Sequence, residues 1–220
     1  MALIFPAPVP VAIPVEGLGD LPLRRIFCVG RNYAAHAAEM GAEPERARPF
    51  FFLKSAHAAI LSGGTLPYPP GTADLHHEVE LAVALGPDAA PLAAGVALDM
   101  TRRDLQAAAK ERRQPWEVGK EFDGAAVFAP MRPADAFGGL GINLSVNGER
   151  RQDGSTDDMI WPVAALLDHL RGLYALAPGD VLLTGTPAGV AAVVPGDRIS
   201  ARIEGFPDLE VTVTAAADPS

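Results

Sequence analysis

The fold is indicated most clearly by residues 75–85, which read LHHEVELAVAL. Side chains alternate in character along this segment, as on a strand whose successive residues point to opposite faces of a sheet. One face would carry His77, Val79, Leu81, Val83 and Leu85, and the other His76, Glu78, Glu80, Ala82 and Ala84. The segment therefore predicts a strand with one continuous apolar face and two glutamates together on the other.

Two carboxylates side by side repel each other unless a cation or water screens them. A hard divalent cation takes oxygen ligands, and Mg²⁺ typically uses a few carboxylates. Asp99 is the best candidate for a third ligand, because it follows the apolar run 96–98 and precedes a predicted helix. The Glu-Val-Glu-Leu pattern is also typical of a half-exposed antiparallel strand. On the pattern alone, both a metal site and a solvated strand face stay open.

The elements before this strand are short. We expect an extended, proline-rich arm over residues 1–23, a strand over 24–29 ending at Gly30, a helix over 33–40 stopped by Gly41, and a buried strand or bend over 49–54. The arm and a single catalytic domain over residues 24–220 are the predicted domain organisation.

After the strand, Thr101 and Asp104 resemble a capping box that opens a helix to about Arg113. Asn147-Gly148 between two strand-like runs predicts a hairpin. A helix is expected over 162–173, and the short strands after residue 178 indicate a β-barrel or roll. The predicted fold class is β-rich α+β.

Composition excludes several classes of protein. The 220 residues include 22 glycines and 21 prolines, which argues against a coiled coil or helical bundle. The formal net charge of −9 makes nucleic acid an improbable partner, although converging cations could still bind an acidic small molecule. Cys28 is the only cysteine, which excludes an internal disulfide or a cysteine zinc site.

The apolar stretch 1–15 has no basic leader and is interrupted by four prolines. It predicts neither a signal peptide nor a membrane span. Together with the single cysteine, this indicates a cytoplasmic protein that has no membrane partner.

Seven motifs, in this order, make the chain resemble the fumarylacetoacetate hydrolase family, most closely its fumarylpyruvate hydrolase and acylpyruvase branch. The motifs are RIFCVGRNYAAHAAEMG (25–41), PFFFLK (49–54), DLHHEVELAVALG (74–86), ALDMTRRDLQ (97–106), QPWEVGKEFD (114–123), VNGERRQDG (146–154) and PGDVLLTGTPAGV (178–190). The resemblance implies a mixed β-sandwich roll with a few peripheral helices, and a homodimer. It also implies Mg²⁺ or Mn²⁺ bound by Glu78, Glu80 and Asp99, which favours the metal site over the solvated strand.

His36 and Glu39 match a family pair that activates water on a segment ordering over the substrate. Three residues apart on a helix, their side chains can meet, and the carboxylate would orient the imidazole. Without the resemblance, they could equally be solvated residues of an alanine-rich helix. Lys120 matches a lysine facing the reacting carbons, and a nearby metal ion is expected to lower its pKa so that it carries a proton. An ordinary surface lysine is the plain alternative.

Three further residues are candidates for substrate binding. Gln106 matches a glutamine that hydrogen-bonds the substrate, and Arg103 would pair with a carboxylate of the substrate or the metal site. Thr186 lies in the turn 184–187, whose backbone N–H groups and hydroxyl could bind a substrate carboxylate. His76 and His77 are expected to support the glutamates without binding the metal.

The chain departs from the family between Glu80 and Asp99, where only 18 residues stand. The family usually has a longer stretch that includes a helix. Either the connection is shortened or residues are missing from the sequence, and a real deletion would disturb the placement of Asp99 first. Because the motifs on both sides are intact, we expect a preserved site.

The activity implied is metal-dependent hydrolysis of the C–C bond of an acylpyruvate (a 2,4-dioxo acid), favouring fumarylpyruvate, with fumarate and pyruvate as products. Hydrolysis would combine His36-activated water with a metal-stabilised pyruvate enolate. The alternatives are an oxaloacetate decarboxylase or a dienoic-acid isomerase on the same site. A non-catalytic ligand-binding protein, with a metal site spoiled by the short connection, is a third possibility.

Overall fold

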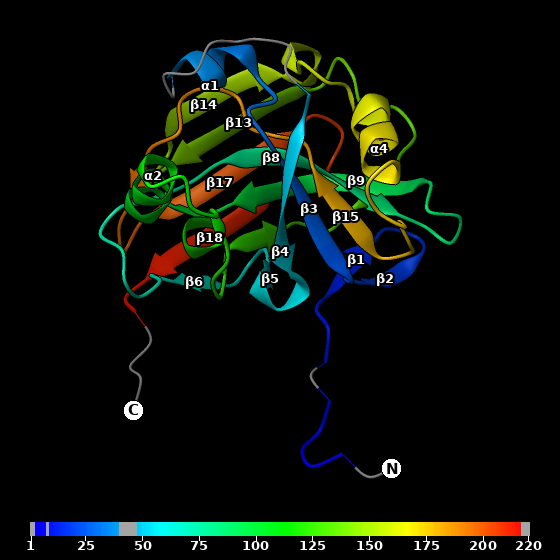
Figure 1. Cartoon of the computed structure of the whole chain (residues 1–220), viewed down its shortest axis with the longest axis horizontal. Helices are drawn as coiled ribbons and strands as arrows, with labels where there is room; N and C mark the ends of the chain where they lie inside the picture. Colours follow the sequence, from blue (N-terminus) through cyan, green and yellow to red (C-terminus); the bar gives the residue numbers. More distant parts are fainter. Residues whose placement is uncertain (1–2, 8, 40–47, 217–220) are drawn as a thin grey trace.

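Two β-sheets face each other across the main hydrophobic core (Figure 1). The computed structural model describes residues 3–7, 9–39 and 48–216. The larger sheet contains β3 (Arg25–Gly30), β4 (Phe50–Ser55), β5 (Ala59–Leu61), β8 (Val79–Leu85), β9 (Pro91–Asp99), β11 (Ala126–Phe128), β12 (Arg132–Pro133) and β15 (Asp180–Leu183). The second sheet contains β6 (Thr65–Pro67), β13 (Gly141–Val146), β14 (Glu149–Ser155), β17 (Arg198–Ile203) and β18 (Leu209–Thr214).

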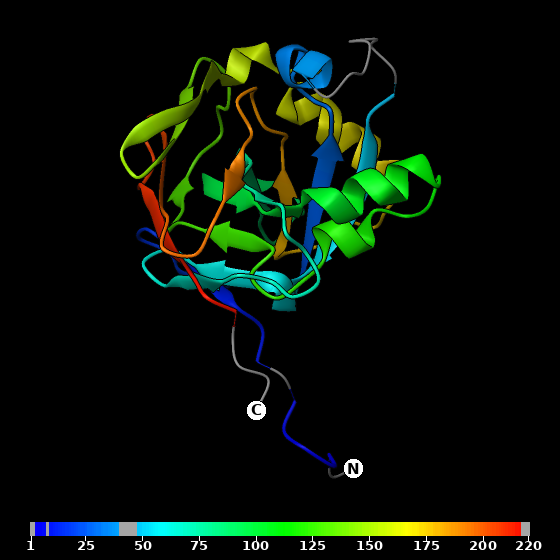
Figure 2. The same ribbon diagram turned by 90° about the vertical axis from the view of Figure 1, so that its left-hand side faces the viewer.

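A small third sheet and a few short helices complete the fold. The third sheet is formed by β7 (Leu75–His76), β10 (Thr101–Arg102) and β16 (Ala192–Val193). The helices are α1 (Ala34–Glu39), α2 (Arg103–Glu111), α3 (Glu117–Lys120) and α4 (Val163–Arg171), with 3₁₀ turns at Ala56–Ala58 and Thr156–Asp158. Figure 2 shows α2 on the outside of the sheets. The predicted β-rich α+β class with peripheral helices is confirmed.

Strand β8 explains why two cores form. Val79, Leu81 and Val83 face the main core, which they share with residues of the second sheet such as Leu144. On the other face of β8, Ala82 and Ala84 belong to a second core. The alternation predicted from the sequence is confirmed, although both faces are buried. The small alanines on one face allow close packing there.

The amino-terminal arm is more structured than predicted. β1 (Ala12–Val15) and β2 (Gly19–Pro22) form an antiparallel hairpin, where the sequence predicted one extended segment. The side chains of Ile13, Val15 and Leu21 are buried in the second core. Prolines at positions 14 and 22 are tolerated because the hairpin is a separate two-stranded sheet.

Helix α1 agrees with the prediction as far as the described residues reach. It covers Ala34–Glu39, and the predicted stop at Gly41 lies outside them. Helix α4 begins after Pro162, as expected. The Asn147-Gly148 turn joins β13 to β14, and positive φ at both residues matches a two-residue hairpin turn.

The predicted capping box at Thr101 is wrong. Arg102 caps α2 without a side-chain hydrogen bond, and Thr101 belongs to β10. The Asp104 carboxylate instead accepts hydrogen bonds from Thr72 Oγ1, at 2.6 Å, and from the Ala73 backbone N–H, at 3.0 Å. Pairing of β10 with β7 takes Thr101 out of the cap position, so tertiary contacts override the local signal.

The short connection between Glu80 and Asp99 is a complete hairpin. β8 and β9 pair antiparallel from Val79↔Leu98 to Leu85↔Pro91, and residues 86–90 form the turn. The Gly86 N–H donates to the Ala90 carbonyl at 2.9 Å, which closes the turn. No helix is needed between the strands, and the hairpin places Asp99 beside the beginning of β8.

Among the helices in the described part of the chain, none is both long enough and apolar enough to cross a lipid bilayer.

Candidate metal centre

Three carboxylates come together where the β8–β9 hairpin ends. One oxygen each of Glu78, Glu80 and Asp99 lies within 4.8 Å of the others, and all three residues are buried. Between β7 and β8 the chain leaves the small sheet and enters the large one, so Glu78 stands at the junction. The Asp99 N–H donates to the Glu78 carbonyl at 2.9 Å. This backbone contact fixes the two ends of the hairpin together.

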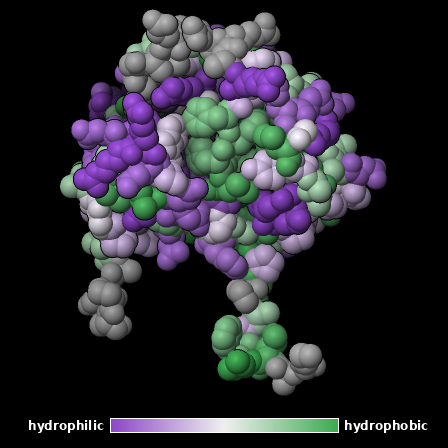
Figure 3. Space-filling model, in the orientation of Figure 1, coloured by the Kyte–Doolittle hydropathy of each residue, from purple (hydrophilic) through white to green (hydrophobic). Residues whose placement is uncertain are grey.

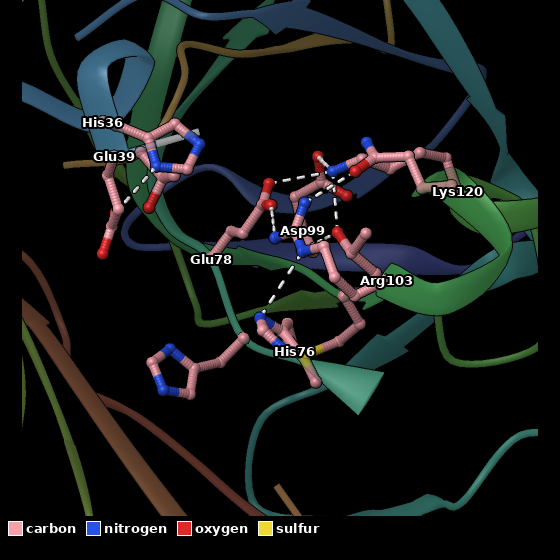
Figure 4. A network of polar contacts seen from close by, with 12 residues as sticks. His36, Glu39, His76, Glu78, Asp99, Arg103 and Lys120 are labelled. Atoms are coloured by element: carbon pink, nitrogen blue, oxygen red, sulfur yellow. Dashed lines mark hydrogen bonds and ion pairs between the residues drawn. The ribbon is translucent and has the colours of Figure 1, made fainter. Parts of the chain in front are cut away.

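Cations surround two of the three carboxylates (Figure 4). Lys120 Nζ lies 2.8 Å from Glu78 Oε2 and 2.7 Å from Asp99 Oδ2. Arg103 Nη2 also donates to Glu78 Oε1. On the other side of Asp99, Lys54 Nζ lies 2.9 Å from Oδ1. Glu80 has a different partner, the backbone N–H of Gly185, at 2.7 Å.

The different partners give Glu78 and Glu80 opposite electrostatic properties. Burial alone raises the pKa of Glu78, but the positive charges of Lys120 and Arg103 outweigh it and hold the pKa well below its usual range. Burial, reinforced by the charges of Asp99 and Glu78, raises the pKa of Glu80. The charge of Lys120 and the Gly185 hydrogen bond offset this effect only in part, and among the described residues no cation forms an ion pair with Glu80.

This donor set fits a hard divalent cation. Three carboxylate oxygens from separate residues converge, and carboxylate oxygens are ligands that Mg²⁺ and Mn²⁺ accept. A cation bound there would favour the ionised form of Glu80, which the side chains alone disfavour. The cluster thus provides the ligands of a metal site, and Glu80 is the carboxylate whose charge a bound cation would balance.

His36 lines the same pocket and is in contact with Glu39. His36 Nδ1 is 3.3 Å from Glu39 Oε2, so the two side chains meet across one helical turn. The backbone N–H of Gly189 donates to both Glu39 oxygens at 3.2 Å. His36 is buried and lines the pocket together with the three carboxylates. The geometry leaves Nε2 as the imidazole atom without a Glu39 contact.

Arg103 and Gln106 also line this pocket. Arg103 Nη1 donates to Gln106 Oε1 at 2.7 Å, and both side chains are buried. The structure therefore brings both candidates to the pocket from one face of α2. Arg103 already contacts Glu78, and this was one of its two predicted partners.

The expected direction of the Lys120 pKa is not the one that the neighbouring side chains give. Burial lowers this pKa, but the carboxylates of Asp99 and Glu78 outweigh burial and raise it above its usual value. A bound metal ion would act against this effect, and its repulsion was the basis of the prediction. With these contacts, Lys120 is a cation that holds the acidic cluster together.

The turn 184–187 binds the acidic cluster itself. Its Gly185 N–H is used by Glu80, so it is not free to bind a substrate carboxylate as the sequence suggested. The Thr186 hydroxyl lines the pocket and accepts a hydrogen bond from Gln152 Nε2 at 2.8 Å. Gly185 has a φ of 91°, and an added Cβ would lie 2.8 Å from the Asn32 Cβ. Only glycine fits at this position.

His76 and His77 are turned to other partners. His76 Nε2 lies 2.9 Å from Asp74 Oδ1. His77 Nδ1 donates to Gln152 Oε1 at 2.9 Å. Neither belongs to the three-carboxylate cluster.

Sequence reasoning missed two buried residues next to the cluster, Lys54 and Gln152. Lys54 ends the aromatic run PFFFLK, and a lysine inside such a strand is the signal that could have indicated a buried anionic partner. Gln152 lies in an exposed-looking stretch of charged residues, ERRQDG, which gave no comparable signal.

Comparisons with known proteins agree with this geometry. The family model described as fumarylacetoacetate (FAA) hydrolase C-terminal matches residues 25–214. A fumarylpyruvate hydrolase from Ralstonia sp is 41% identical over 180 residues, which is 76% of this chain and 93% of the relative. The oxaloacetate tautomerase YcgM of Escherichia coli K12 is 40% identical over 201 residues, or 84% and 91% of the two chains.

A solved structure provides the third comparison. The fumarylpyruvate hydrolase of Pseudomonas aeruginosa, in complex with Mn²⁺ and pyruvate, superposes with a TM-score of 0.91 at 42% identity. The match covers 97% of this chain and 100% of the other. From the family match, these relatives and the buried carboxylate cluster, the chain belongs to the fumarylacetoacetate hydrolase family of metal-dependent hydrolases and tautomerases.

Proposed function

We propose that this protein hydrolyses the C–C bond of an acylpyruvate, with fumarylpyruvate as the favoured substrate and fumarate and pyruvate as products. The observation that carries the proposal is that His36, which contacts Glu39, lines the same pocket as Glu78, Glu80 and Asp99. A base beside an acidic metal site is what hydrolysis of a 2,4-dioxo acid requires. The fumarylpyruvate hydrolases of Ralstonia and Pseudomonas support the choice of substrate.

His36 is the proposed base. Its Nδ1 faces Glu39, which favours the tautomer with the proton on Nδ1 and leaves Nε2 to accept a proton from water. The Gly189 N–H holds the Glu39 carboxylate and so orients the pair. Glu39 also stabilises the imidazolium that forms once His36 has taken the proton.

The His36–Glu39 pair is sufficient for the proton transfers between water and the leaving carbon. The water oxygen bonds to the acyl carbon while its proton passes to His36. The bond between the acyl carbon and C3 of the pyruvate unit then breaks, and its electron pair stays on C3 as the enolate. The imidazolium returns the proton to C3. The acyl fragment leaves as a carboxylate, and the second proton of water is released to solvent.

Glu78, Glu80 and Asp99 would hold Mg²⁺ or Mn²⁺, which when bound supplies a Lewis acid for the charge of the enolate. Lys120 and Arg103 position Glu78 and Asp99 for that role. Gln106, held by Arg103, and Thr186, held by Gln152, offer an amide and a hydroxyl to the substrate. Lys120 then acts as a fixed positive charge in place of a proton carrier.

Conversion of oxaloacetate is the second candidate function. The observation that favours it is the 40% identity to an oxaloacetate tautomerase. Both tautomerisation and decarboxylation of oxaloacetate pass through an enolate of the same kind, but neither requires activated water. The third possibility, a non-catalytic protein, assumed that the short connection separates the metal ligands. In the structure, the three carboxylates lie together. That reason for a non-catalytic role therefore does not apply.

Replacing His36 discriminates between these reactions. In metal-loaded protein, we expect His36→Gln to lower pyruvate release from fumarylpyruvate at least about 100-fold, the lower range of general-base effects. Decarboxylation of oxaloacetate would change much less. Release is followed by a coupled pyruvate assay over a panel of acylpyruvates.

The matched control is His57→Gln, because His57 is exposed in the turn Ala56–Ala58. Wild-type protein that releases no pyruvate from any acylpyruvate would contradict the proposal. Equal rates of hydrolysis in wild type and His36→Gln would contradict the role of His36. The homodimer and the cytoplasmic location stay predictions.

A further inference from the structure

Two cations in the pocket have no carboxylate partner among the described residues. Arg31 and Lys110 both line the pocket that contains the three carboxylates. Arg103, Lys120 and Lys54, by contrast, each contact Glu78 or Asp99. The three carboxylates and these three contacting cations carry equal and opposite formal charge. Arg31 and Lys110 therefore add uncompensated positive charge at the pocket.

The backbone of Arg31 is strained in a way that points to a function. Its φ is 59°, a left-handed conformation that an arginine side chain disfavours. The residue directly follows Gly30, at the end of β3, and its side chain is exposed. Strained backbone at a pocket is commonly retained because of what the side chain does there. Glycine would adopt the same conformation without strain.

The rings of Phe52 and Trp116 form an aromatic wall between the acidic cluster and Lys110. Lys120 Nζ lies 5.1 Å from the centroid of the Phe52 ring, and the Phe52 and Trp116 centroids are 6.2 Å apart. Lys110 Nζ lies 4.7 Å from the Trp116 centroid. A planar, unsaturated chain could lie on this wall, with one end at the cluster and the other at Lys110.

The wall continues to the surface. Arg31, Phe52 and Trp116 also line an adjoining cavity of about 410 Å³, next to Phe50 and Phe51. Figure 3 shows apolar residues gathered in the middle of this face, where β3 and β4 lie, with hydrophilic residues around them. Arg31 thus stands between the pocket and a partly apolar opening.

The surroundings of Lys110 are electropositive. Burial, together with the charges of Arg103 and Arg31, lowers the pKa of Lys110 to about 8. An anion bound between Arg31 and Lys110 would relieve this repulsion and gain charge-assisted hydrogen bonds.

From these observations we propose that Arg31 and Lys110 bind a second carboxylate at the far end of the acyl group. The protein would then select dianionic acylpyruvates over mono-anionic ones. This inference rests on the proposed function for the reaction, and it assigns residues to the substrate's distal end, which the acidic cluster does not reach. It also explains how an acidic protein with a net charge of −9 attracts a dianion.

Two substitutions test the proposal without disturbing the cluster. Arg31→Gly suits the positive φ, and Lys110→Met keeps an aliphatic chain on Trp116. Fumarylpyruvate is compared with acetylpyruvate, which has a methyl group in place of the distal carboxyvinyl group. Each variant is expected to lower kcat/KM for fumarylpyruvate at least about tenfold, mainly through KM, because a charge-assisted contact is lost. Acetylpyruvate turnover should stay within about threefold.

A binding measurement separates this proposal from the proposed reaction. Mn²⁺-loaded wild-type protein is titrated with fumarate and with crotonate, in which a methyl group replaces one carboxylate. We expect fumarate to bind at least about tenfold more tightly, and the preference to disappear in both variants. This comparison needs no turnover, so it stands even if neither acylpyruvate is hydrolysed.

The control is Arg112→Met, which removes an exposed positive charge from the same helix end outside the pocket. It should change neither the substrate ratio nor the fumarate preference. The proposal is overturned if Arg31→Gly and Lys110→Met lower kcat/KM for both acylpyruvates by the same factor. It is also overturned if both variants keep the wild-type preference for fumarate.

Discussion

Glu80 is the residue on which the metal site depends most. Its carboxylate accepts a backbone hydrogen bond from Gly185, but in the part of the chain that the structure describes no cation contacts it. Glu78 and Asp99, in contrast, are each contacted by a lysine. Without a bound metal, the ionised form of Glu80 is therefore a source of instability in the folded protein.

We expect Glu80→Gln to stabilise the metal-stripped protein at neutral pH. Burial and the charges of Asp99 and Glu78 raise the pKa of Glu80 above the value of 4.5 for an unperturbed glutamate. A raised pKa means that the contribution of Glu80 to stability is present below 4.5 and lost as the pH rises through the folded-state value. The free energy of unfolding of Glu80→Gln should thus exceed that of the wild type only slightly in acid, and the difference should grow toward neutral pH.

Urea unfolding of chelator-treated wild type and Glu80→Gln between pH 4.5 and 8 measures this difference. Glu111→Gln, an exposed change on α2, serves as the control. A variant that is less stable than the wild type at neutral pH, or a difference independent of pH, would show that Glu80 is not destabilising.

At the scale of elements, Gln152 joins three segments that build the site. From β14, its Oε1 accepts hydrogen bonds from His77 Nδ1 and from the Val79 N–H, at 2.9 and 3.1 Å. Its Nε2 donates to Thr186 Oγ1 and to the Pro187 carbonyl, at 2.8 and 2.9 Å. One fully buried amide therefore positions the segment that carries Glu78 and Glu80 against the turn that binds Glu80.

Gln152→Leu is expected to lower the free energy of unfolding by about 2–4 kcal/mol, because it leaves several buried donors and acceptors without partners. It should also weaken Mn²⁺ binding, since the junction between β7 and β8 loses its anchor. Denaturant unfolding and calorimetric titration with Mn²⁺ measure the two effects.

Gln114→Leu makes the same chemical change at an exposed position and should leave both properties unaltered. If Gln152→Leu binds Mn²⁺ with wild-type affinity, Gln152 contributes to stability but does not position the ligands.

The elements show which sequence signals were sufficient. The alternation in β8 reports a local pattern, and it correctly predicted which residues face the main core, whereas the second core on the other face was not predicted. Asp99 was found because an acid that ends an apolar run is unusual. The capping box at Thr101 failed because pairing with β7 decided the position, which no local pattern reports.

Across the whole molecule, the site is assembled from segments far apart in the chain. His36 comes from α1, the carboxylates from the β8–β9 hairpin, Lys120 from α3 and Thr186 from the turn after β15. The sequence could not identify the partners of Lys54 and Gln152, because Asp99 lies 45 residues from Lys54 and Val79 lies 73 residues from Gln152. The carboxylate contacts that raise the Lys120 pKa in the metal-free protein were hidden for the same reason, and the effect of a bound metal ion on this pKa stays a prediction.

Because the ligands meet only in the folded chain, metal binding should stabilise the whole molecule. With free Mn²⁺ at about 100 times the dissociation constant, mass action adds about 2.7 kcal/mol. For a chain of this length, we expect the melting temperature to rise by about 5–10 °C. Differential scanning calorimetry of stripped and Mn²⁺-loaded protein checks this value.

The same addition to Glu80→Gln should give a much smaller shift, because one ligand of the cluster is lost. A shift of equal size in both proteins would place Mn²⁺ outside the three-carboxylate cluster.

The β8–β9 hairpin has a consequence for how this chain tolerates changes in length. Its turn, residues 86–90, lies at the end opposite the carboxylates, about 20 Å away along the seven residues of β8. The register of the two strands, rather than the number of residues between them, sets the position of Asp99 relative to Glu80. Insertions or deletions at the turn therefore leave the ligands in place, which makes residues 86–90 a suitable point for grafting an epitope or a reporter peptide.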